Sequence, residues 1–274
     1  MLNIVKSLLF RLKKSKMYWI MLGVCALLPI LLSLLCHFVI EFAKAFVDIP
    51  PNMGLEGTTY QTLTGLAPIS SDINLFALLC TSIFLCKEFT DGTIRNALLS
   101  NKSRWQVYLS YAVTSLIIGG SYLMAGFVST MLSLAIPFGF GAVTAGQAIS
   151  ACLCSLLLGI LSMMVVVSCV LMFLFLTGKQ APSIVLPILI TLFLPTLAVA
   201  VVEYASNLIM MMQMGGQWTE VVIDYTWVPF YNVLMYDSSS VDGGLVAKIS
   251  LYYVVFTALF VWIGSLAARK KDLK

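Results

Sequence analysis

Six long apolar segments divide this sequence, and each is long enough, or nearly so, to cross a lipid bilayer as a helix. A bilayer core about 30 Å thick needs about 20 apolar helical residues. The segments cover residues 17–40, 68–86, 107–136, 148–177, 183–202 and 248–268. Only 10% of the residues are charged, against about 25% in an average soluble domain. The chain is therefore predicted to be an all-α membrane protein with six transmembrane helices in a single transmembrane domain, residues 1–274.

Basic residues indicate which way the six predicted spans face. Every Lys and Arg except Lys44 and Lys248 lies in the N-terminal segment, in residues 87–106, at position 179 or at the C-terminal end. Cytoplasmic loops carry an excess of Lys and Arg. We therefore expect a multi-pass protein of the cell (plasma) membrane with both termini cytoplasmic. Residues 203–247 are then extracellular or interfacial.

The segment 1–16 is predicted to form an amphipathic helix. Val5, Leu8, Leu9 and Leu12 recur at helical spacing, while the lysines lie away from that stripe. A basic amphipathic helix lies on the inner membrane surface, with its lysines near anionic lipid. A basic topology signal without ordered structure is the alternative.

Several kinds of chemistry lack the residues they need. His37 is the single histidine and has no neighbouring set of metal ligands. Four of the predicted spans carry essentially no ionisable group at their centres, which disfavours an ion-coupled carrier and leaves an intramembrane enzyme a remote alternative. Gly178-Lys179-Gln180 lacks the other residues of a phosphate-binding loop. We expect no cofactor or metal in this chain, no catalytic residue and no nucleic-acid partner.

Residues 87–106 form a polar island between the second and third predicted spans. Gly92 permits a break in the helix, and apolar side chains recur at helical spacing beyond it. Ser103 with Gln106 forms a candidate capping box for the third span. On the predicted topology the island is a cytoplasmic helical projection whose apolar ridge suits a groove on a soluble partner. An ordinary cytoplasmic connector is the alternative.

This island resembles the motif of ABC-2 type permeases, the membrane subunits of a class of ATP-driven transporters that are mainly exporters. The matching residues are Glu88-Phe89, Gly92-Thr93-Ile94-Arg95-Asn96, Leu98-Leu99, Ser103-Arg104 and Tyr108. The basic N-terminal helix, the six spans and the long outer segment before the last span also match that family. The family often has Lys shortly after the Tyr, where this chain has Leu109-Ser110-Tyr111.

The resemblance implies a coupling helix at about residues 90–100, within a cytoplasmic coupling loop. The residues implied in coupling are Glu88, Phe89, Gly92, Thr93, Ile94, Arg95, Asn96 and Leu98. Glu88 and Arg95 would contact the ATPase or hold the projection against the N-terminal helix, while Ile94 and Leu98 would fill the partner's groove. The resemblance also implies separate ABC ATPase (nucleotide-binding) subunits that bind ATP and Mg. A second permease, either a copy of this chain or a paralogue, would complete the pathway.

The cargo is described only by class. A pathway without buried charge favours an amphipathic peptide, drug or lipid-like cargo, and the size of the chain resembles permeases of bacterial peptide-antibiotic immunity and bacitracin-type resistance systems. A second hypothesis is a sensing or immunity module that binds its ligand at the outer membrane face without export. The aromatic side chains for such a contact are Trp218, Tyr225, Trp227, Phe230 and Tyr231. The sequence leaves export and sensing open.

Overall fold

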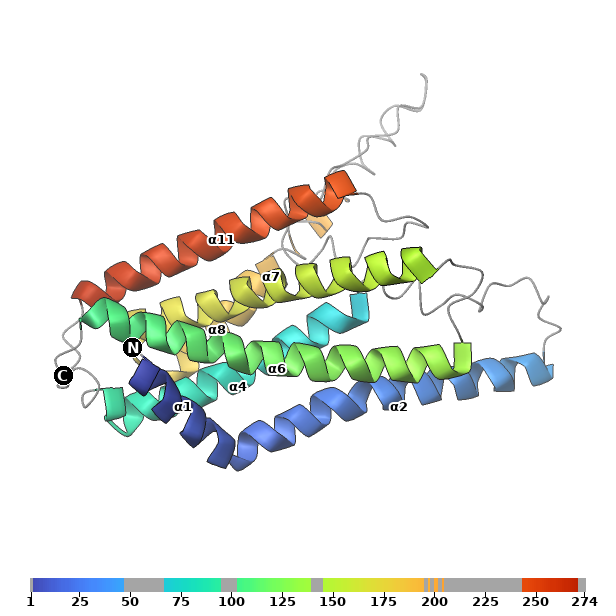
Figure 1. The fold of residues 1–274 in the computed structure, drawn as a ribbon, viewed down its shortest axis with the longest axis horizontal. Coiled ribbons are helices and arrows are strands. Elements are labelled where there is room, and N and C mark those ends of the chain that lie inside the picture. The colour runs from blue at the N-terminus through green and yellow to red at the C-terminus, as the bar shows by residue number, and fades with distance from the viewer. Residues whose placement is uncertain are drawn as a thin grey trace, which may run out of the picture.

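The computed structural model describes residues 2–46, 67–94, 103–138, 145–194 and 243–270, together with residues 197, 200, 201 and 204. These parts are almost entirely helical and contain no strand, which confirms the all-α prediction for them. The helices run side by side in an elongated bundle (Figure 1). In chain order they are α1 (Leu2–Lys14), α2 (Lys16–Phe46), α4 (Ala67–Thr90), α6 (Arg104–Phe138), α7 (Ala145–Thr177), α8 (Gln180–Ile188), the π-helix η1 (Leu189–Phe193) and α11 (Gly243–Lys270).

Four of these helices are long and apolar enough to cross a membrane. The apolar stretches are Lys16–Val39 in α2, Arg104–Ser133 in α6, Gly146–Thr177 in α7 and Val246–Arg269 in α11. Helix α4 covers the second predicted span, and α8 with η1 begins the fifth. Crossing of the membrane by α4 and by the fifth segment stays a prediction.

Helix α7 lies at the centre of the bundle and packs against α4, α6, α8 and α11. Every residue from Val165 to Val170 is buried, which is typical of a helix surrounded by others. Helices α2 and α11 lie at opposite edges of the view (Figure 1) and expose many of their apolar side chains, including Leu31, Phe38, Leu251 and Trp262. Such exposed apolar surface suits contact with lipid or with another membrane helix.

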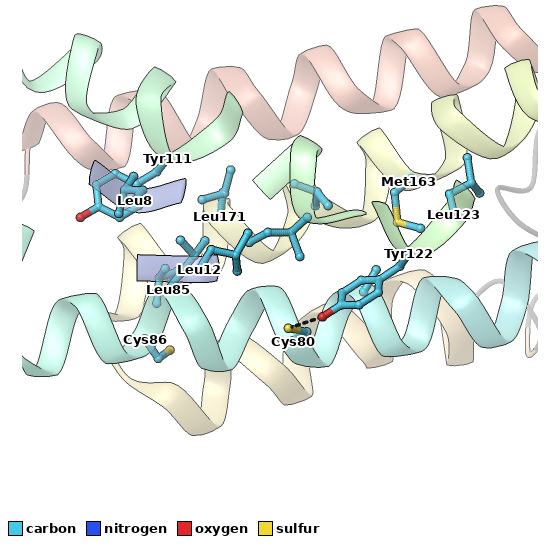
Figure 2. Close-up of a cluster of buried hydrophobic side chains, with 14 of the residues drawn as sticks. Leu8, Leu12, Cys80, Leu85, Cys86, Tyr111, Tyr122, Leu123, Met163 and Leu171 are labelled. Atoms are coloured by element: carbon cyan, nitrogen blue, oxygen red, sulfur yellow. Dashed lines mark hydrogen bonds between the residues drawn. The ribbon is translucent and has the colours of Figure 1, made fainter. Parts of the chain in front are cut away.

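Small residues and hydroxyl groups bring the central helices together. A Cβ atom added at Gly159 of α7 would lie 2.9 Å from Leu123 Cδ1 of α6, so glycine permits this close approach. The Tyr122 hydroxyl donates to Cys80 Sγ over 2.8 Å and so joins α6 to α4 (Figure 2). These contacts place the inner faces of α4, α6 and α7 in one buried cluster.

A glycine ends α7 and lets the chain turn into α8. Gly178 has a φ of 67°, a left-handed conformation that glycine adopts readily. Its N–H donates to the carbonyl oxygen of Leu174 over 2.8 Å, which is a common way to end a helix. The Gly178-Lys179-Gln180 tripeptide therefore connects two helices.

Candidate functional site

The described part of the polar island follows α4 at one end of the bundle. Helix α4 ends at Thr90, and residues 88–94 form what we call the α4 turn. Gly92 has a φ of 70°, and its N–H donates to the carbonyl oxygen of Phe89 over 3.2 Å. A left-handed residue of this kind is usually glycine. The helix break predicted at Gly92 is confirmed.

Glu88 is a buried carboxylate in the α4 turn, with 6% of its surface exposed. Arg11 Nη1 of α1 donates to Glu88 Oε2 over 2.7 Å. The Thr93 hydroxyl lies within hydrogen-bonding distance of both the carboxylate and the carbonyl oxygen of Glu88, and the Tyr111 hydroxyl of α6 hydrogen-bonds the Thr93 side chain. A buried charge is costly unless it is paired and hydrogen-bonded. Arg11 and Thr93 therefore stabilise Glu88 and tie the α4 turn to α1 and α6.

This pairing is one of the two roles that the sequence left open for Glu88. The carboxylate holds the α4 turn against the N-terminal helix, as the ion pair with Arg11 shows. A sequence separation of 77 residues divides the two partners, so no local pattern identifies them as a pair. Contact of Glu88 with another protein stays a prediction.

The two sides of the α4 turn differ in exposure. Lys87, Thr90 and Asp91 are exposed. Ile94 is only 3% exposed and belongs to the buried cluster that also contains Leu8 and Leu12 of α1. The side chains of Leu8 and Leu12 are drawn within this cluster in Figure 2. Ile94, which was predicted to fill a groove on a partner, thus packs inside this chain.

The N-terminal helix forms as predicted, and its apolar stripe faces the bundle. Val5, Leu8 and Leu12 are buried, whereas Lys6 and Lys13 are exposed. Because the stripe is covered by protein, the exposed surface of α1 is largely basic. Its contact with the inner membrane surface stays a prediction.

Five aromatic rings from three helices meet beside the α4 turn. We call Phe89 of α4, Trp105, Tyr108 and Tyr111 of α6, and Phe175 of α7 the aromatic cluster. The centroid of the Phe175 ring lies 5.2 Å from that of Phe89 and 5.0 Å from that of Tyr108, both in edge-to-face geometry. It lies 6.2 Å from the Tyr111 centroid. Such edge-to-face pairs add about 0.5–1.5 kcal/mol to the stabilisation from burial.

Only Phe89 of this cluster belongs to the predicted coupling residues. A sequence signal for the other rings exists, since Trp105, Tyr108 and Tyr111 recur every third residue. That spacing places them along one face of a helix. Phe175 carries no comparable signal, because it lies in an apolar run where any position could face the core.

Helix α11 reaches the same end of the bundle. A Cβ atom added at Gly264 would lie 2.4 Å from the Tyr108 hydroxyl oxygen, so the Tyr108 ring lies directly against the α11 backbone. Arg104 Nη1 donates to the carbonyl oxygen of Arg269 over 2.7 Å. A cation at the C-terminal end of a helix interacts favourably with the helix dipole. The start of α6 is thereby fixed to the end of α11.

Ser103 caps α6 through one of the two hydrogen bonds of the predicted capping box, since the N–H of Gln106 donates to Ser103 Oγ over 3.3 Å. The predicted coupling residues Arg95, Asn96 and Leu98 lie outside the described residues. So do the predicted outer contacts, which are Trp218, Tyr225, Trp227, Phe230 and Tyr231.

Residues of α1, α4, α6 and α7 meet at this end of the bundle. Among the described side chains, no group of three or more His, Cys, Asp or Glu is placed to hold a metal ion. What the site offers instead is a short exposed turn held by one ion pair to α1 and by ring contacts to α6 and α7. No protein-family model and no curated protein matches this sequence.

Proposed function

We propose that this chain is the membrane subunit of an ATP-driven ABC exporter of the ABC-2 type. The observation that carries the proposal is the α4 turn. Its residues resemble the motif of ABC-2 permeases, and its buried Glu88 is paired with Arg11 of α1 at one end of the bundle. The four membrane-length helices and the predicted positive-inside topology support the same proposal.

In this proposal the α4 turn is where force from ATP hydrolysis enters the chain. Lys87, Thr90 and Asp91 are exposed and present the turn to a separate ATPase subunit. Arg95, Asn96 and Leu98 are proposed to take part in the same contact. Ile94 anchors the turn from within. Because the turn is attached to α1, α6 and α7, a displacement imposed by the ATPase moves the helices instead of bending a loose loop.

The described interior favours an uncharged pathway. Apart from Glu88, the buried polar groups of the described side chains are hydroxyls of Ser, Thr and Tyr and thiols of Cys. An ion-coupled carrier needs ionisable groups at membrane depth, and an ATP-driven subunit does not. We propose an amphipathic peptide, drug or lipid-like cargo. We also propose that a second permease, a copy or a paralogue, completes the pathway in the cell membrane, with both termini of this chain cytoplasmic.

The test is purification of the tagged full-length chain from its native membrane, followed by measurement of magnesium-dependent ATP hydrolysis and identification of bound subunits by mass spectrometry. We expect an ATPase to co-purify. Asp91→Lys reverses the charge on the exposed side of the turn, so a partner surface complementary to Asp91 meets an unfavourable charge. A cost of about 1.4 kcal/mol leaves about tenfold less ATPase bound. Gln147→Lys is the matched control, because Gln147 is exposed near the opposite end of α7.

Isolation of the wild-type chain without any ATP-hydrolysing partner would contradict the proposal. Equal loss of the partner in Asp91→Lys and Gln147→Lys would place the contact elsewhere. A complex that hydrolyses ATP but releases no labelled peptide from cells, compared with an ATPase-inactive control, would favour the sensing or immunity function over export.

A further inference from the structure

The α4 turn and the last turns of α11 belong to helices that both pack on α6 and α7. A displacement of one helix reaches the other through side chains on these two central helices. The aromatic cluster occupies this position. We propose that Phe175 of α7 is the positioning residue that couples movement of the α4 turn to the end of α11.

The first step of this coupling joins the turn to α7. Phe89 directly follows Glu88, so a shift of the Glu88 backbone moves the Phe89 ring. That ring meets the Phe175 ring edge-on, at an interplanar angle of 86°. Phe175 is 1% exposed, and close-packed interiors leave a buried ring little space in which to absorb a displacement.

The second step joins Phe175 to α11 through Tyr108. The two ring centroids are 5.0 Å apart, and Tyr108 is fully buried. Tyr108 also lies against Gly264 of α11, where an added Cβ would be 3.0 Å from the Tyr108 Cζ atom. The buried Tyr108 ring is therefore packed against both α7 and α11, so a displacement of Phe175 is passed through it to α11.

Phe175 is the ring of the cluster that contacts both Phe89 of the α4 turn and Tyr108, the ring that lies against α11. It touches Phe89 of α4 as well as Tyr108 and Tyr111 of α6. Phe173 lies two residues earlier on α7, is only partly buried and lies outside the cluster. This pair of phenylalanines on one helix allows a matched comparison.

The role of this coupling in transport rests on the proposed function, whereas the coupling itself is a property of this chain. It is measured by hydrogen–deuterium exchange of the full-length protein in lipid nanodiscs. Glu88→Gln removes the buried charge that pairs with Arg11. We expect about tenfold faster exchange in the turn, because a hydrogen bond to a charged group has about this effect on local opening. We expect a smaller acceleration over residues 264–270 of α11.

The coupling appears as non-additivity between the two sites. In Phe175→Leu, adding Glu88→Gln should still accelerate exchange in the turn but should no longer change exchange in residues 264–270. In Phe173→Leu, the effect of Glu88→Gln should reach α11 as in the wild type. If the Glu88→Gln protein does not fold, Arg11→Gln is used in place of Glu88→Gln in each comparison. It breaks the same ion pair from the more exposed partner.

Two outcomes overturn the inference. One is a change confined to the α4 turn while Phe175 is present. The other is an equal change in α11 whether position 175 is Phe or Leu. Neither outcome involves an ATPase, so neither contradicts the proposed function. Conversely, absence of an ATPase partner would contradict the proposed function but not this coupling.

Discussion

Gly264 sets the distance between α6 and α11. A Cβ atom at this position would lie 2.4 Å from the Tyr108 hydroxyl oxygen, and the ring cannot swing away because Trp105 and Phe175 pack against it. Overpacking of a buried contact typically costs about 1–3 kcal/mol. We therefore expect Gly264→Ala to lower the Tm of the detergent-purified protein.

Two further variants show whether this contact is the cause. Gly120→Ala on α6 adds a methyl group where nothing lies within 4 Å, so its Tm should stay the same or rise slightly, since Ala favours helices. Tyr108→Phe removes the atom nearest the added methyl group and should restore part of the loss. Its own cost should be small, because none of the described residues hydrogen-bonds the Tyr108 hydroxyl. Equal Tm values for Gly264→Ala with and without Tyr108→Phe would contradict this explanation.

Residues whose role depends on near neighbours in sequence were predictable. Gly92 ends its helix through its own backbone conformation, and Ser103 caps the helix that starts beside it. The environment of Glu88 was not predictable, because its partner Arg11 reaches it only when α1 docks on the bundle. The burial of Ile94 was not predictable either, since the cluster that contains it is assembled from several helices.

Among the elements, α1 is held by its apolar stripe and by one ion pair. The Arg11 side chain is 44% exposed and that of Glu88 only 8%, so solvent weakens the pair but loss of Arg11 leaves a buried carboxylate. A double-mutant cycle with Arg11→Gln and Glu88→Gln should give a coupling energy of about 1 kcal/mol. The readout is the rate of trypsin cleavage at Lys13 and Lys14, which rises when α1 detaches.

Lys6→Gln provides the control for this cycle. Lys6 is exposed on α1, so its loss removes a positive charge from the helix without touching the ion pair. It should leave cleavage at Lys13 and Lys14 close to the wild-type rate. Strictly additive effects of Arg11→Gln and Glu88→Gln would show that the pair does not hold the helix.

The helices extend beyond the apolar segments that predicted them. Helix α2 continues to Phe46 and α4 to Thr90, because backbone hydrogen bonds continue into polar sequence until a breaker such as Gly92 intervenes. The π-helix Leu189–Phe193 was not predicted. Pro187 in the turn before it removes a backbone donor. Hydrophobic spacing does not show whether the N–H groups that follow form α-helical or π-helical hydrogen bonds.

At the scale of the whole molecule, the helix α1 and the last turn of α11 lie at the same end of the bundle (Figure 1). Together with the basic residues near both ends of the chain, this leads us to expect both termini in the cytoplasm. Epitope tags at residues 1 and 274 should resist protease added to intact cells and be cleaved after permeabilisation. A protease site inserted in the segment 205–242 should be cleaved in intact cells.

A protected N-terminal tag with an exposed C-terminal tag would contradict an even number of spans.

The order in which helices surround α7 was not accessible to sequence analysis. A nearly uniform apolar helix can face either lipid or another helix. Which helices pack together is decided by small residues such as Gly159 and by individual hydroxyl groups.

The central position of α7 also has a consequence for biosynthesis. Chains are made from the N-terminus, so α2, α4 and α6 are complete before α7 emerges. Until then their inner faces, which α7 later covers, meet only one another or the surrounding lipid. Helix α11, which packs mainly on α7, follows later still. Packing around α7 is therefore a late event, and a ribosome that stalls before α7 leaves α2, α4 and α6 with only their contacts to one another.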